Sequence, residues 1–218
     1  MTPGTPEPRA ARTHRAGTPH QVHGWHHLYP DDEHWAGWNP GNGITEHARV
    51  IAAQIATTPT AREAVRRGVE AVNDAALAKG RSVGTASIWV PDRTTGEVRG
   101  VVMETLHGFP TPEQATPEAF IARSWRRDYG GWRVRITERS AEVFECDAGR
   151  GVVETIVGRL RGERTVQAYS SFFVFPHDGT PEAVQLAFNT VHLDQLVELT
   201  VLGRSITESL EITTGPAT

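Results

Sequence analysis

Five histidines lie close together near the start of the chain and could supply ligands to a metal ion. They are His20, His23, His26, His27 and His34. Imidazole is a common ligand of transition metals, so the cluster indicates a metal site if the backbone brings the rings together. Gly24 and Pro30 disfavour a continuous helix through this segment, and no acidic residue is placed as in the H-E-x-x-H motif. We therefore predict a polar segment without a metal, and name His20, His23, His26 and His27 as the only candidate ligands.

Ser82 lies in a G-x-S-x-G motif that runs from Gly80 to Gly84. In a nucleophile elbow this motif follows a strand and begins a helix, which presents the serine beside an oxyanion hole. Here a helical pattern precedes the motif and a strand pattern follows it, which is the reverse order. Gly80 is then explained as the residue that ends the helix. A hydrolase that uses Ser82 stays as the alternative to a function without catalysis.

Basic and aromatic residues alternate between Trp125 and Arg135, where the sequence reads WRRDYGGWRVR. Arginines bind phosphates and aromatic rings stack on bases, so the pattern could form a platform for single-stranded nucleic acid. The alternative is that Trp125 and Trp132 pack inward while the arginines point outward. The formal net charge of −4 favours this alternative.

Cys146 is the only cysteine of the 218 residues, so an intramolecular disulfide and zinc sites with several cysteines are excluded. On a predicted strand it is interpreted as a small buried side chain. The phosphate-binding loops G-x-x-x-x-G-K-[ST] and G-x-G-x-x-G are both absent. We predict no catalytic residue and no cofactor.

The hydrophobic periodicity predicts elements that would have to position any site. Apolar residues at helical spacing predict a helix from Ile44 that stops at Pro59, and a second that begins with a Thr60 and Glu63 capping box and ends at Gly80. Another helix follows Thr116, and a last one follows the cap Asp194. Strands are predicted over residues 85–90, 97–106, 132–137, 142–146, 152–160, 165–175, 184–190 and 209–213.

These elements predict the α+β class, with an antiparallel sheet flanked by helices. Residues 1–21 are rich in proline and poor in bulky apolar side chains, which predicts a disordered N-terminal arm. Residues 22–213 are expected to form one domain, and residues 214–218 a flexible tail. No stretch is apolar and long enough for a membrane span, and no secretory signal is recognised, so we expect a cytoplasmic protein.

The C-terminal part resembles the PsbP-like superfamily, which includes a Ran-binding nuclear import factor. The resemblance covers about residues 85–213 and depends on FFVFP (Phe172 to Pro176), VQLAFNT (Val184 to Thr190) and ITESLEI (Ile206 to Ile212). It implies an α/β/α sandwich and binding of other proteins. Residues 66–80 look like an insertion in uncharacterised actinobacterial members, some of which lie near type VII secretion genes. No functional residue is carried over, because no binding motif matches.

Together these observations predict a non-enzymatic, cytoplasmic protein-binding or accessory module. Its partner is expected to be another protein, with no membrane and no nucleic acid. The alternative is a hydrolase or a metal-dependent enzyme that uses Ser82 or the histidine-rich segment. An exposed apolar patch would favour the first, and a deep pocket that gathers His, Asp or Glu would favour the second.

Overall fold

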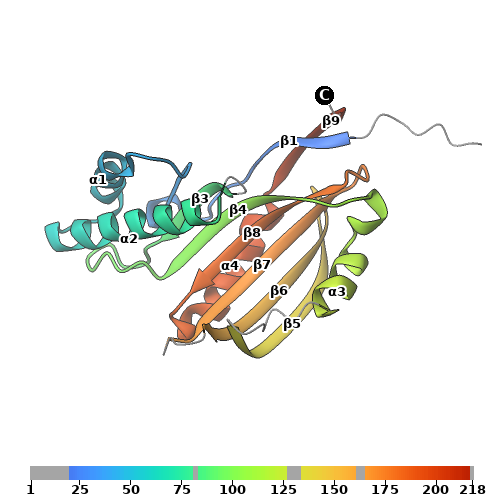
Figure 1. The fold of residues 1–218 in the computed structure, drawn as a ribbon. Coiled ribbons are helices and arrows are strands. Elements are labelled where there is room, and N and C mark those ends of the chain that lie inside the picture. The colour runs from blue at the N-terminus through green and yellow to red at the C-terminus, as the bar shows by residue number, and fades with distance from the viewer. Residues whose placement is uncertain (1–19, 81–82, 127–133, 161–164, 217–218) are drawn as a thin grey trace, which may run out of the picture.

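Seven antiparallel strands form the main sheet of a computed structural model that describes residues 20–80, 83–126, 134–160 and 165–216 (Figure 1). In sheet order the strands are β2 (Trp35–Trp38), β3 (Val83–Trp89), β4 (Gly100–Gly108), β8 (Glu182–Thr190), β7 (Gln167–Pro176), β6 (Gly149–Leu160) and β5 (Val134–Cys146). Strand β4 pairs with β8 although 73 residues separate the end of one from the start of the other. The sheet therefore depends on pairing between distant parts of the chain.

The two ends of the described chain pair with each other. Strand β1 (His20–His26) and strand β9 (Glu211–Pro216) form a two-stranded antiparallel ribbon that extends from one end of the main sheet (Figure 1). The ribbon begins two residues before the expected domain boundary at Val22. It also takes in Thr214 to Pro216, which were expected to belong to a flexible tail. These residues are ordered by pairing between two segments that are distant in the sequence, so neither segment alone carries a sequence pattern that predicts it.

Helices cover both faces of the sheet. Alternation along β7 separates the faces, because Phe172 and Val174 pack with α4 (Leu196–Glu208) whereas Phe173 and Phe175 pack with α3 (Pro117–Arg126). Helices α1 (Ile44–Ile55) and α2 (Pro59–Ala78) share the α3 face and cover β2, β3 and β4. Figure 1 shows α2 and α3 over opposite ends of the sheet. The predicted α+β class and α/β/α arrangement are confirmed.

Helix α2 begins two residues before its predicted start. Its N-cap is Thr58, whose side chain accepts a hydrogen bond from the backbone NH of Ala61 at 3.1 Å. Pro59 occupies the first turn, where a missing NH costs nothing. The capping box predicted at Thr60 was therefore wrong, since Pro59 both ends the first helical pattern and begins the second helix.

Two further sequence-based expectations were wrong on this side of the molecule. Strand β5 is continuous, where residues 132–137 and 142–146 were predicted as separate strands, because the residues between them also pair with β6. A bulge lies between Ile136 and Glu138. Trp125 was expected to pack inward, but its side chain is 51% exposed. The Arg139 guanidinium lies over its ring, 4.8 Å from the centroid.

No helix among the described residues has both the length and the apolar character needed to cross a membrane.

We expect Gly96→Ala to destabilise the fold more than Gly179→Ala. Both glycines have positive φ, 68° and 73°, which strains alanine at either position. A Cβ at Gly96 would also lie 2.3 Å from the carbonyl oxygen of Ala61 on α2, whereas a Cβ at Gly179 would meet no atom within 4 Å. Urea denaturation should show losses of about 2–4 and about 1 kcal/mol in the free energy of unfolding. Equal losses would show that the close approach of Gly96 to Ala61 on α2 does not add to the cost of an alanine side chain.

Candidate functional site

The four histidines considered as metal ligands point to different partners. Three contact separate carboxylates: His20 with Asp178, His26 with Glu211 and His27 with Glu104, at 3.1, 3.1 and 3.2 Å. The fourth, His23, lies against Gly215 of β9. Because β1 is extended, successive side chains point to opposite sides and the rings spread along the strand. The structure does not gather these four rings at one point.

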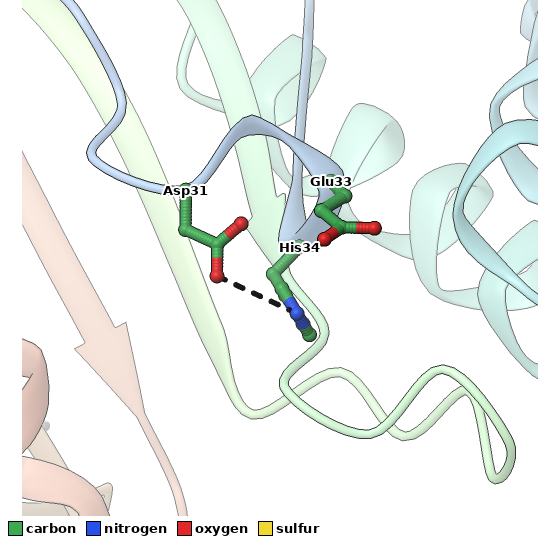
Figure 2. A group of neighbouring side chains, drawn as sticks. All are labelled: Asp31, Glu33 and His34. Atoms are coloured by element: carbon green, nitrogen blue, oxygen red, sulfur yellow. Dashed lines mark ion pairs between the residues drawn. The ribbon is translucent and has the colours of Figure 1, made fainter.

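The fifth histidine belongs to a different group. Within the described ranges, the one set of three potential metal ligands is Asp31, Glu33 and His34, whose ligand atoms lie within 4.8 Å of one another (Figure 2). His34 Nδ1 lies 3.1 Å from the carbonyl oxygen of Val90, and Nε2 lies 3.5 Å from the Asp31 carboxylate. The group lies in and just before the short 3-10 helix Asp32–His34 that precedes β2.

A structural role explains this group without a metal. Glu33 accepts a 2.5 Å hydrogen bond from Arg93, which also donates to the carbonyl oxygens of Gln54 and Ile55. Arg93 thus satisfies carbonyls at the end of α1, where a helix lacks its own donors. A metal at Asp31, Glu33 and His34 would compete with Arg93 for the Glu33 carboxylate, so we assign no metal here.

A buried acid and a buried histidine meet on the α4 face of the sheet. Glu104 on β4 and His27 have side chains that are 4% and 9% exposed. One Glu104 oxygen accepts a 2.8 Å hydrogen bond from the Trp25 indole NH. The other lies 3.2 Å from His27 Nε2, but the angles are not those of a hydrogen bond, and both atoms lack any other partner among the described residues.

The environment of this pair favours its neutral form. Burial, and to a lesser extent the nearby His26, lowers the pKa of His27 to about 4. Burial raises the pKa of Glu104, against the opposing effect of the hydrogen bond from Trp25. The distance alone suggests an ion pair, but both shifts oppose charging, so we describe the contact as one between a neutral imidazole and a carboxyl group.

Aromatic packing next to this pair holds the opening segment on the sheet. The Tyr29 hydroxyl donates to Ser87 Oγ at 2.6 Å, and the Tyr29 ring stacks on Trp35 at 4.7 Å. With so little exposed surface, the pair leaves no space for a substrate, and its evident role is to join β1 to β4.

Glu104 was not among the sequence-based candidates. The available signal was its place between Val102 and Leu106, which alternation assigns to the buried face.

The other sequence-based candidates give no reactive group in the part of the chain that the structure describes. Ser82 and residues 127–133 of the basic and aromatic segment lie outside it. The neighbouring elements are as predicted, because α2 precedes the serine motif and β3 follows it. Cys146 is half-buried, and burial raises the pKa of its thiol, which disfavours a thiolate nucleophile.

The outer face of α4 carries an exposed apolar row. Val197 and Val201 of α4 are 75% and 64% exposed, and Leu193, in the 3-10 turn before α4, continues their spacing of four residues. Leu199 and Ile206 bury the opposite side of the helix against the sheet. The row continues to Val191, which is also exposed. Four of the large apolar side chains exposed on the described surface therefore belong to one continuous segment.

The other face of the sheet contains a pocket beside α3. It has a volume of about 560 Å³ and is lined by residues of β4, α3, β6, β7 and β8. Aromatic rings form part of the wall, and polar side chains of the sheet form another part. This pocket and the α4 row lie on opposite faces of the sheet, so they are independent candidate sites.

No protein-family model and no curated protein matches this chain. Among solved structures it matches the solution structure of cyanobacterial PsbP (CyanoP) from Synechocystis sp. PCC 6803, over 94% of this chain and 99% of that chain. The TM-score is 0.42 and the sequence identity is 13%. A match with this TM-score and identity adds nothing about family, activity, partner or site. The resemblance to the PsbP-like superfamily and the actinobacterial branch therefore stay predictions.

Acidification should destabilise the protein through His27. In the unfolded chain this residue gains a proton as the pH falls below about 6.5, whereas in the folded chain it stays neutral until about pH 4. The stabilising contribution of neutral His27 is therefore complete above pH 6.5 and is lost as the pH falls through this window. The raised pKa of Glu104 favours the folded state as the pH falls, which opposes the effect of His27. A variant of His27 is therefore needed to separate the contribution of the histidine.

Between pH 7 and pH 4.5 we expect the free energy of unfolding of the wild type to fall by about 2–3 kcal/mol more than that of His27→Gln. Urea denaturation at both pH values measures it. The control is His26→Gln, since the His26 side chain is 66% exposed. This variant should change the free energy of unfolding by less than about 0.5 kcal/mol. A pH-independent difference for His27→Gln would refute the neutral buried histidine.

Proposed function

We propose that this chain is a non-enzymatic protein-binding module whose docking surface is the outer face of α4. The observation that supports the proposal is the row of Leu193, Val197 and Val201, which stays exposed on a helix whose other side is fully packed. Contiguous exposed apolar surface costs free energy in water, and on stable proteins it commonly marks an interaction site. A row at intervals of four residues suits a partner helix packed along α4.

The charges beside the row indicate the chemistry of the partner. Asp194, Glu198 and Glu208 are exposed on the same segment, and the α4 residue Arg204 is 3.5 Å from Glu142 on β5. The edge of the surface is therefore mainly acidic. We infer that the partner presents an apolar stripe flanked by lysine or arginine. A second copy of this chain is a poor occupant, because a symmetric dimer would bring the acidic edges together.

The exposed edge strand β5 is a less suitable docking site. Its outward positions carry charged side chains, among them Glu138, Glu142 and Glu145, and a bulge interrupts its pairing with β6. Charges and bulges on an edge strand oppose addition of a further strand. The apolar row on α4 has no such protection.

The enzymatic alternative receives less support from the geometry. The buried pair His27 and Glu104 is enclosed, and burial disfavours the charged form of each side chain. Glu33 of the three-residue group is bound to Arg93. A hydrolase through Ser82 stays an untested alternative. Action in the cytoplasm and a link to type VII secretion are parts of the proposal that come from the sequence alone.

Val201→Asp should abolish capture of the partner. Burying one valine at an interface contributes about 1.5–3 kcal/mol, and an aspartate there adds a desolvation cost and joins an already acidic edge. The full-length protein and this variant are used as bait in native cell extract, and bound proteins are quantified by mass spectrometry. We expect at least about tenfold loss of a stoichiometric partner, and weaker capture by wild type at higher salt.

Val50→Asp is the matched control, because Val50 is an exposed valine on α1, a different helix on the other face of the sheet. It should capture the partner as wild type does. Circular dichroism and urea denaturation establish that both variants are folded. If wild type and Val201→Asp capture the same proteins in the same amounts, or if the only protein on the surface is a second copy of the chain, the proposal is wrong.

A further inference from the structure

The pocket beside α3 combines a polar floor, aromatic walls and one cation. Its floor includes His107, Ser171 and Gln185, its wall includes Phe120 and Phe173, and Arg123 lies at its side. Its volume of about 560 Å³ lies within the range of small-molecule sites. It uses the face of the sheet opposite α4, so a ligand bound here would be independent of the proposed docking surface.

A chain of hydrogen bonds fixes the polar floor. His107 Nε2 lies 2.6 Å from the Gln185 side-chain oxygen, and the Gln185 amide nitrogen donates to Ser171 Oγ at 3.1 Å. This arrangement assigns the Nε2 proton to His107 and orients the Gln185 amide. The Ser171 hydroxyl accepts one bond and keeps its own proton to donate. The floor is thus ordered before a ligand arrives and offers a donor to it.

Aromatic rings form a flat apolar wall. Phe120 from α3 packs on Phe173 from β7, with ring centroids 4.3 Å apart. Phe109 and Phe120 are both buried, which fixes their rings against the sheet. Planar apolar groups pack well against such rings, in offset or edge-on geometry. The wall therefore suits a flat ligand body rather than a polar or highly charged one.

The charged residues of the pocket differ in their pairing. Glu154 is 4% exposed, and one of its oxygens accepts bonds from Arg139 at 2.6 Å and Ser124 at 3.3 Å. Arg123 is half-buried with its guanidinium 4.7 Å from the Phe109 ring centroid, and no carboxylate of the described residues lies within ion-pair distance of it. The positive charge that the pocket leaves uncompensated is therefore on Arg123, and it calls for an anion.

We propose that this pocket binds a small monocarboxylic acid with a flat apolar body, whose carboxylate contacts Arg123 and whose body packs on Phe109, Phe120 and Phe173. A planar guanidinium matches a carboxylate with two parallel hydrogen bonds. The ordered floor accepts a polar substituent through Ser171. Because Glu154 is paired with Arg139, Arg123 is the one charge of the described pocket lining left for a ligand, so the ligand carries one carboxylate.

The test compares 2-naphthoate with its neutral isostere 2-naphthamide by isothermal titration calorimetry on the full-length protein. We expect 2-naphthoate to bind at least about tenfold more tightly, since a hydrogen bond between Arg123 and a carboxylate is stronger than one to a neutral amide. Arg123→Gln should reduce 2-naphthoate affinity to that of 2-naphthamide and leave 2-naphthamide unaffected. Arg123→Lys, which keeps the charge, should retain part of the preference.

Arg49→Gln is the matched control, because Arg49 lines a separate cleft between α1 and α2 together with Arg62 and Arg66. This variant should bind 2-naphthoate as wild type does. Loss of binding in Arg49→Gln but not in Arg123→Gln would place the acid in the other cleft and overturn the proposal. Equal affinity for 2-naphthoate and 2-naphthamide, or no binding of 2-naphthoate at millimolar concentration, would also overturn it.

Discussion

The alternation of side chains across the sheet is the constraint on which the rest of the structure depends. Each strand residue belongs to one of two faces, and both faces must be covered because both are apolar over much of their area. On one face Phe172 and Phe188 are fully buried beneath α4. Gly203 allows this close approach, since a Cβ there would lie 2.6 Å from the Phe172 ring. Helix α4 can reach the sheet only with this side, which leaves Val197 and Val201 outward.

The second face is covered incompletely, and the pocket is the consequence. Helices α1 and α2 pack over β2, β3 and β4, while α3 is short and packs over β6 and β7. Between them the inward positions of β4, β7 and β8 carry polar side chains where a covered sheet would carry apolar ones. His107, Gln185 and Ser171 satisfy one another through hydrogen bonds, so the exposed floor costs little.

Local sequence patterns were sufficient to predict the helices and most strands. They were insufficient to predict the strand pairings and contacts between residues that are distant in the sequence. The row of Ala48, Ile51 and Ile55 predicted α1, and Thr116 was correctly recognised as a cap, with its side chain 3.2 Å from the Ala119 NH. The pairing of β1 with β9 joins the two ends of the described chain, so neither segment carries a local sign of it. The histidine cluster suggested a metal site that the structure does not show, because β1 is an extended strand in which neighbouring rings point to different partners. Alternation along the strand could have placed Glu104 on the buried face, but its contact with His27 and the pocket depend on the tertiary structure.

The distribution of polar groups supports binding over catalysis. A catalytic group needs a pKa matched to its task together with access to a substrate. The lowered pKa of His27 does not indicate such a group, because His27 is enclosed beside Glu104 and the shift reflects the cost of burying charge. By contrast, Arg123 lines the pocket, and the valines of α4 expose apolar surface that no other part of the described chain covers. The proposed binding role therefore depends on the exposed apolar row of α4 and on the pocket beside α3, and not on a reactive group.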